Sequence, residues 1–81
     1  MDEMLLQLLE AIEQIEQDSS VPRNVKARLQ NAREALQESG MDIKLKANKA
    51  IQELDEIAED PNVPSFVRPQ IWNVVSMLEG L

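Results

Sequence analysis

The chain has 81 residues, of which 43% are hydrophobic, a fraction typical of a globular protein and too high for a disordered one. It has a net charge of −7 and no histidine, cysteine or tyrosine, so the usual general bases, nucleophiles and thiolate metal ligands are missing. We therefore expect no enzymatic activity, cofactor, metal site or small-molecule substrate.

The first predicted helix covers residues 2–18. Its apolar residues recur at steps of four and three, the spacing of one helix face, and we expect that stripe in the core. The stripe consists of Met1, Leu5, Leu8, Ile12 and Ile15. Met4, Leu6 and Leu9 widen it, and glutamates occupy the opposite side. Asp2 is the expected N-cap.

The second and third predicted helices cover residues 22–39 and 42–59. Their apolar stripes have the same spacing. The residues expected in the core are Val25, Leu29, Ala32 and Leu36, then Ile43, Ala47, Ala50, Leu54 and Ile57, with Ile51 and Ala58 at the edge of the stripe. Gly40 suits the left-handed conformation that follows many helices, and Asp42 is the expected N-cap of the third helix.

The fourth predicted helix covers residues 64–80. Its stripe consists of Val67, Ile71, Val74, Leu78 and Leu81. Pro69 leaves two possible starts. With Ser65 as N-cap, Pro69 falls in the first turn, where a missing N–H costs little; alternatively, the helix begins at Pro64 itself. We favour the later start. In the first half of the chain the same choice lies between Asn24 as cap and Pro22 as first residue.

The bend after the first helix recurs 42 residues later. Residues 18–22 (DSSVP) match residues 60–64 (DPNVP), and the apolar positions of the flanking helices also match. Each aspartate is expected to accept a backbone N–H of its turn, and each valine to pack on the next helix. The halves therefore predict two duplicated helical hairpins. A period near 42 also occurs in helical solenoids, but those usually need three repeats.

The predicted fold is therefore all-α, a four-helix antiparallel up-and-down bundle in a single domain over residues 1–81. No apolar run approaches the roughly 18 residues of a membrane span. The acidic N-terminus lacks the basic region of a signal peptide. We expect a cytoplasmic protein without membrane contact. At this length hydrophobic burial roughly balances chain entropy, so oligomerisation or very regular packing would supply the remaining stability.

Seven of the eight basic residues lie between Arg23 and Lys49. One interpretation is a nucleic-acid patch that contacts phosphates without sequence specificity. Its candidate residues are Arg23, Lys26, Lys44, Lys46 and Lys49. The competing interpretation is internal complementarity, in which the basic second helix lies beside the acidic first one.

The fourth helix carries apolar residues around much of its circumference, including Phe66 and Trp72, the only aromatic residues of the chain. A helix of this kind is either central in a core or covered by a partner. The candidate protein interface consists of Phe66, Trp72, Val75 and Met77. It predicts a homodimer or a protein partner, whereas in the simpler interpretation Trp72 only covers the edge of the bundle.

Three segments resemble an uncharacterised archaeal protein family, number 0147. They are Asp18–Val25 (DSSVPRNV), Asp60–Pro64 (DPNVP) and Ile71–Glu79 (IWNVVSMLE). The resemblance extends over essentially the whole chain and implies a short, all-helical archaeal protein that folds as a four-helix bundle. It implies no activity, cofactor or catalytic residue.

The leading hypothesis is a small non-enzymatic helical interaction module that associates with itself or binds a protein through the fourth helix. The alternative is an RNA- or ribosome-associated accessory protein that uses the basic residues of 23–49.

Overall fold

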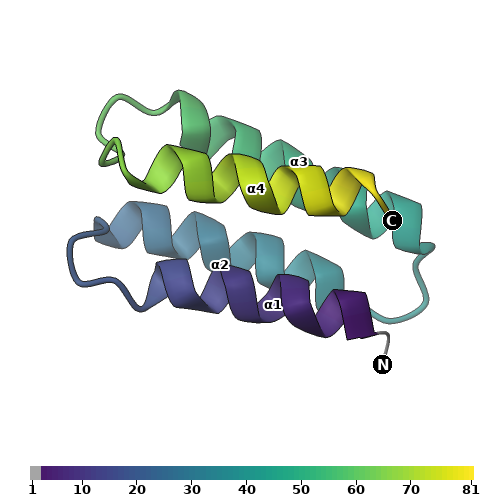
Figure 1. Ribbon diagram of the computed structural model, residues 1–81. Helices are drawn as coiled ribbons and strands as arrows, with labels where there is room; N and C mark the ends of the chain where they lie inside the picture. Colours follow the sequence, from purple (N-terminus) through teal and green to yellow (C-terminus); the bar gives the residue numbers. More distant parts are fainter. Residues whose placement is uncertain (1–2) are drawn as a thin grey trace.

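The computed structural model describes residues 3–81 and contains four helices. They are α1 (Glu3–Glu16), α2 (Arg23–Gln37), α3 (Ile43–Glu59) and α4 (Val67–Glu79). Each helix packs against its neighbours in a closed ring, and the backbones of the diagonal pairs α1–α3 and α2–α4 lie farther apart. Both aspartate bends lie at one end of the bundle, opposite the α2–α3 connection (Figure 1). This is the predicted up-and-down four-helix bundle.

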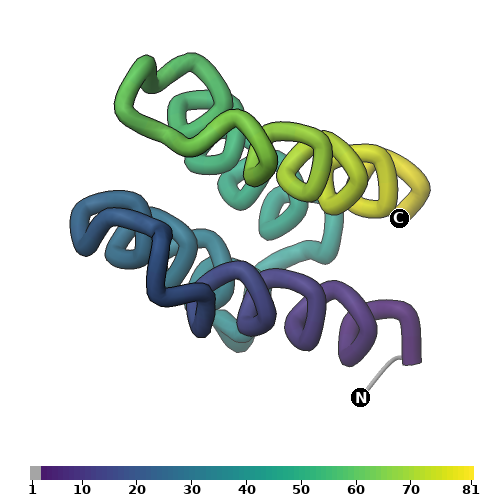
Figure 2. The backbone as a smooth tube through the Cα atoms, turned by 60° about the vertical axis from the view of Figure 1, so that its left-hand side comes forward, coloured from purple at the N-terminus to yellow at the C-terminus, as the bar shows by residue number. Residues whose placement is uncertain are grey.

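The two hairpins form two stacked layers, α1 with α2 and α3 with α4 (Figure 2). The molecule measures 33 × 20 × 19 Å. The contact between α2 and α3 is the most extensive of the four, and that between α1 and α4 is the least extensive. The α1–α4 side is therefore the weakest seam of the ring.

The core is entirely aliphatic. It consists of the predicted stripes of all four helices together with one valine from each bend, Val21 and Val63. Both valines are buried in this core, as residues that pack down from a bend should be. Among the described residues, no polar or charged side chain is buried.

Three residues assigned to the stripes lie at the surface instead. Met4, Leu6 and Ile43 are exposed. They belong to the first turns of α1 and α3, at the end of the bundle where fewer neighbouring turns cover them. The stripe also continued to Met1, and Asp2 was the expected cap; both lie outside the described residues.

The two bends share their hydrogen bonds. Asp18 Oδ1 accepts the Ser20 N–H at 3.0 Å, and Asp60 Oδ1 accepts the Asn62 N–H at 2.8 Å. In each bend the valine N–H also donates to the aspartate carbonyl, at 3.1 and 3.2 Å. The Ser20 hydroxyl donates to Asp18 Oδ1 as well, at 2.6 Å. These bonds favour the charged carboxylate, so they lower the pKa of Asp18.

The second bend and α4 differ from the first bend and α2. Helix α2 begins at Arg23 with Pro22 as its N-cap, and Asn24 lies within the helix. Helix α4 begins three residues later than its predicted bound of 64, after a tight turn in which the Val67 N–H donates to the Pro64 carbonyl at 3.0 Å. Pro69 is therefore the third helical residue, and no intrahelical bond is lost. The later start is confirmed, but the expected N-cap is wrong: Phe66, and not Ser65, is the N-cap, and no side chain caps the helix.

The α2–α3 connection follows the predicted chemistry. Gly40 has a φ of 78°, a left-handed conformation that suits glycine. Asp42 caps α3 by accepting the Lys44 N–H at 2.9 Å. Helices α1 and α2 each end two residues before their predicted bounds of 18 and 39, because Glu38 and the first bend already have extended or turn backbone.

Candidate functional site

The outer face of α4 carries both aromatic residues of the chain. The side chain of Trp72 is 55% exposed and that of Phe66 is 46% exposed. At about 100° per residue they lie roughly 120° apart around the helix. The strip between them consists of the exposed residues Pro69, Asn73 and Ser76. Together these five residues form an uncharged surface, called here the α4 face.

The other two predicted interface residues lie inward of the α4 face. Val75 is only 8% exposed and belongs to the core, and Met77 is partly buried against it. Val75 thus extends the core stripe of α4 and is covered within the bundle. The structure therefore does not bring the four candidate residues together on one surface.

Arg68 ties α4 to the end of α3. Its Nε donates to the Ala58 carbonyl at 3.1 Å, and its Nη2 donates to the Asp60 carbonyl at 3.0 Å. A guanidinium at the C-terminus of a helix binds carbonyls that lack intrahelical donors, and it also favours the negative end of the helix dipole. The sequence reasoning missed this contact. The sequence feature that could have indicated it is the position of Arg68, a basic residue in the first turn of the helix that follows a tight bend.

The candidate nucleic-acid residues fall into two groups. Arg23 and Lys26 lie at the start of α2, beside the bends. Lys44, Lys46 and Lys49 lie at the start of α3, at the other end of the bundle. The 15 residues of α2 separate the two groups by about 20 Å, at 1.5 Å per residue. The structure does not bring the five residues into one patch.

Several basic residues contact acids of neighbouring helices. Arg33 donates to both carboxylate oxygens of Glu16, at 2.8 and 3.1 Å, and lies 3.7 Å from Glu13. The hydrogen bond to Glu16 is the main reason that the pKa of Arg33 is raised. Arg28 lies 2.6 Å from Glu56 of α3. The acidic and basic segments thus neutralise each other in part across α1–α2 and α2–α3.

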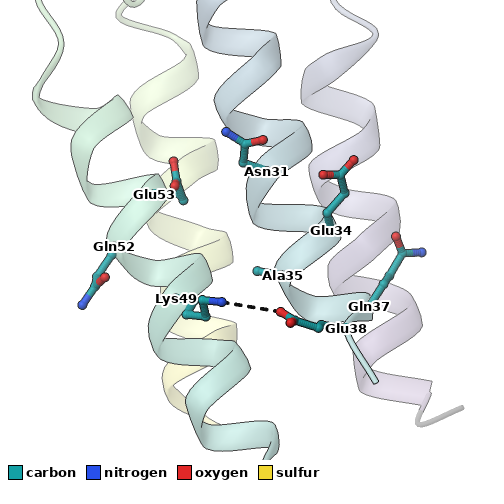
Figure 3. A pocket seen from close by; sticks show the side chains of 8 residues that line it. All are labelled: Asn31, Glu34, Ala35, Gln37, Glu38, Lys49, Gln52 and Glu53. Carbon is teal, nitrogen blue, oxygen red and sulfur yellow. Dashed lines mark hydrogen bonds and ion pairs between the residues drawn. The ribbon is translucent and has the colours of Figure 1, made fainter. Parts of the chain in front are cut away.

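An open groove lies between the second half of α2 and the first half of α3 (Figure 3). Its volume is about 510 Å³. It is lined by Asn31, Glu34, Ala35, Gln37, Glu38, Lys49, Gln52 and Glu53. Lys49 reaches Glu38 across it at 3.5 Å. Ligand pockets are usually enclosed and largely apolar, so this polar groove is a poor candidate for a small-molecule site.

Metal and membrane sites were also sought in residues 3–81. No three residues of the types His, Cys, Asp and Glu are grouped so as to hold a metal ion there. None of the described helices combines the length and apolar character needed to cross a bilayer.

Known proteins similar to this chain share its sequence over most of its length. A family model described as "Uncharacterised protein family (UPF0147)" matches residues 1–81. A UPF0147 protein of Sulfurisphaera tokodaii is 46% identical over 68 residues, which are 84% of this chain and 76% of the relative. A UPF0147 protein of Methanocaldococcus jannaschii is 40% identical over 78 residues, which are 96% of this chain and 84% of the relative.

A solved structure has the same fold. The crystal structure of a protein of unknown function superposes with a TM-score of 0.93 at 40% sequence identity, over 98% of this chain and 90% of the other. The descriptions of these proteins state no activity, and no enzyme family is indicated. The function must therefore be inferred from the molecular surface.

Proposed function

Because the chain belongs to the uncharacterised protein family UPF0147, we propose its function from its surface: a small non-enzymatic interaction module that binds protein through the α4 face. The observation that supports this proposal is the exposure of Trp72 at 55% in a chain whose core is otherwise aliphatic. Large aromatic side chains bury much apolar area when a partner covers them, and tryptophan is enriched among the residues that dominate binding energy.

The first half of the chain provides an internal comparison. At the 42-residue shift, Trp72 matches Gln30 and Phe66 matches Asn24 (72 − 42 = 30; 66 − 42 = 24). Both residues of α2 are polar and exposed, as expected for a helix face in water. The fold therefore does not need an aromatic side chain at either position, and the aromatics of α4 call for another explanation. Contact with a protein supplies one.

The absence of charge on the α4 face also favours a protein partner. The cores of protein interfaces are depleted of charged residues, whereas nucleic-acid surfaces are rich in Lys and Arg. All five residues of the α4 face are uncharged.

Affinity purification of the tagged protein from its native lysate, with and without nuclease, tests the proposal. The matched variants are Trp72→Gln, which introduces the residue found at the equivalent position of α2, and Gln30→Ala. We expect a protein to co-purify both with and without nuclease. It should still co-purify with the Gln30→Ala variant and should be lost with Trp72→Gln. Retention that is lost with nuclease and with reversal of the Lys44, Lys46 and Lys49 charges, but not with Trp72→Gln, would contradict it and favour RNA binding.

A further inference from the structure

Three residues of α4 form a stripe beside the α4 face: Arg68, Trp72 and Glu79. At about 100° per residue they lie within roughly 40° of one another. Arg68 and Glu79 are the only charged residues of the helix, and their separation of 11 positions (79 − 68) spans about 16 Å at 1.5 Å per residue. The stripe thus has a positive end, an aromatic side chain near its centre and a negative end.

Two such stripes are complementary when they lie antiparallel, because the positive end of each then meets the negative end of the other. Two copies of α4 can lie antiparallel about a two-fold axis that crosses the helices at the level of residues 73 and 74. Residue i of one copy is then level with residue 147 − i of the other (68 + 79 = 147). Arg68 then faces Glu79 of the second copy, and symmetry forms this pair twice. The two Trp72 positions are offset by only about 4.5 Å along the helix axis, so the two indole rings can reach each other across the interface.

The charge of the whole molecule also selects this face for contact between copies. Each chain has a net charge of −7, so two copies repel each other over a screening length of about 8 Å at physiological salt. A contact through the outer side of α1 would place glutamates opposite glutamates. The α4 face carries no charge, and the stripe beside it has one charge of each sign, so two copies can approach there with the least repulsion.

Both charged ends of the stripe can accept a partner. Arg68 is held in place by its bonds to the carbonyls of Ala58 and Asp60, which use two of the five N–H donors of a guanidinium. Glu79 is exposed and forms no ion pair within residues 3–81. Lys44 borders the same surface hollow as Glu79 without pairing with it.

Helix α2 lacks this pattern. The residues at the matching positions, 42 earlier in the chain, are Lys26, Gln30 and Gln37. They include no aromatic residue and no acid, so these positions of α2 cannot form the same stripe.

We propose that the protein bound by α4 is a second copy of this chain, packed antiparallel about a two-fold axis with Arg68 of each copy facing Glu79 of the other. This inference rests on the protein-binding role proposed for the α4 face. One helix from each copy makes an interface at the small end of the known range, so the dimer should be reversible and dependent on concentration.

Sedimentation equilibrium of the purified protein between roughly 1 µM and 1 mM tests the pairing, since small interfaces dissociate in this range. Three variants are compared with the wild type: Trp72→Gln, Glu79→Arg and Glu10→Arg. The last two have the same net charge (−7 + 2 = −5), and Glu10 lies on α1 and forms no ion pair with another residue of the described range 3–81. Circular dichroism checks that each variant is folded.

We expect a wild-type dimer whose dissociation constant rises at least about hundredfold with Trp72→Gln, since each substitution acts twice. Glu79→Arg should raise it about tenfold by opposing like charges, and Glu10→Arg should not raise it. A wild type that stays monomeric overturns the proposal, as does a dimer that withstands Trp72→Gln or responds equally to both arginine variants. A monomer would leave the binding role of α4 to be decided by the purification from nuclease-treated lysate.

Discussion

Single residues determine both where the helices end and what the surface offers. The aspartates of the bends accept backbone N–H groups that no helix satisfies, and the valine three residues later anchors each bend in the core. Trp72 has the opposite character, because it is large, apolar and exposed. The contacts of the bends therefore stabilise the fold, whereas we propose that Trp72 contacts a partner. Substitutions at these positions should separate stability from association.

Replacing Asp60 tests the structural role of the bend. Asp60→Ala removes the acceptor for the Asn62 N–H and should lower the free energy of unfolding by roughly 1 kcal/mol, as for other lost caps. Urea titration followed by circular dichroism measures the change. Protein binding should survive at concentrations where the variant is folded. A loss of binding without a loss of stability would instead assign the bend a functional role.

The pH dependence of stability tests the hydrogen bonds of Asp18. Their effect is to lower its pKa in the folded state, so their contribution is present above the ordinary aspartate pKa of about 3.9 and is lost as pH falls through the folded value. The free energy of unfolding should thus decrease below about pH 4. Asp18→Asn keeps an acceptor but cannot titrate, so its decrease should be shallower. Identical slopes for variant and wild type would contradict this assignment.

Trp72 and its neighbour Ile71 provide a contrast in stability. Ile71 is fully buried, and Ile71→Ala should cost roughly 2–5 kcal/mol through lost burial and a cavity. Trp72→Gln should change the unfolding free energy of the monomer by no more than about 0.5 kcal/mol, as surface substitutions do. Chemical denaturation at low protein concentration measures both. A large loss with Trp72→Gln would indicate that the side chain belongs to the bundle.

The helices themselves were largely predictable, because all four carry apolar residues at helical spacing and are separated by recognisable turns. The predictions of burial were wrong where the spacing of apolar residues does not show which other helices cover a position. Met4, Leu6 and Ile43 fit the stripes but lie in end turns, and Val75 does not belong to the candidate interface because it is buried in the core. The contact of Arg68 with the end of α3 joins residues ten apart across a bend, which periodicity does not describe.

The two hairpins match in sequence but differ in the polar contacts between their helices. In the first, Arg33 of α2 forms a paired hydrogen bond with Glu16 of α1. The matching residues of the second are Val75 and Ala58 (33 + 42 = 75; 16 + 42 = 58), which pack in or against the core. The second hairpin gains its polar link from Arg68 instead. In each hairpin, one arginine thus forms hydrogen bonds that link the two helices beside their shared apolar core.

Arginine substitutions test these links between elements. Arg68→Ala should cost roughly 1–2 kcal/mol of stability, because two charge-assisted bonds to carbonyls are lost. Arg68→Lys should recover less than half of this loss, since an ammonium cannot reproduce the planar fork. Thermal unfolding at equal protein concentration compares the three proteins. Full recovery with lysine would show that charge alone, without the fork geometry, holds α4 to α3.

At the scale of the whole molecule, the four helices close a ring whose faces differ in charge. The outer side of α1 is acidic, and the basic residues of α2 and α3 are partly neutralised by acids of neighbouring helices or divided between the two ends of the bundle. The α4 face is uncharged and bears both aromatic residues. We propose that the bundle acts as a rigid support for α4 as its binding helix. The central claim is therefore that α4, and not α2, meets another protein.

Photo-crosslinking inside the native cell tests this claim most directly. A photoreactive amino acid is placed at Ser76 on the α4 face, next to Trp72 around the helix, or at Glu34, the matching position of α2 (76 − 42 = 34), both of which are exposed. We predict a discrete protein adduct from position 76, identified by mass spectrometry and abolished by Trp72→Gln, and none from position 34. Equal adducts from both positions, or an adduct from position 76 that persists with Trp72→Gln, would contradict the account.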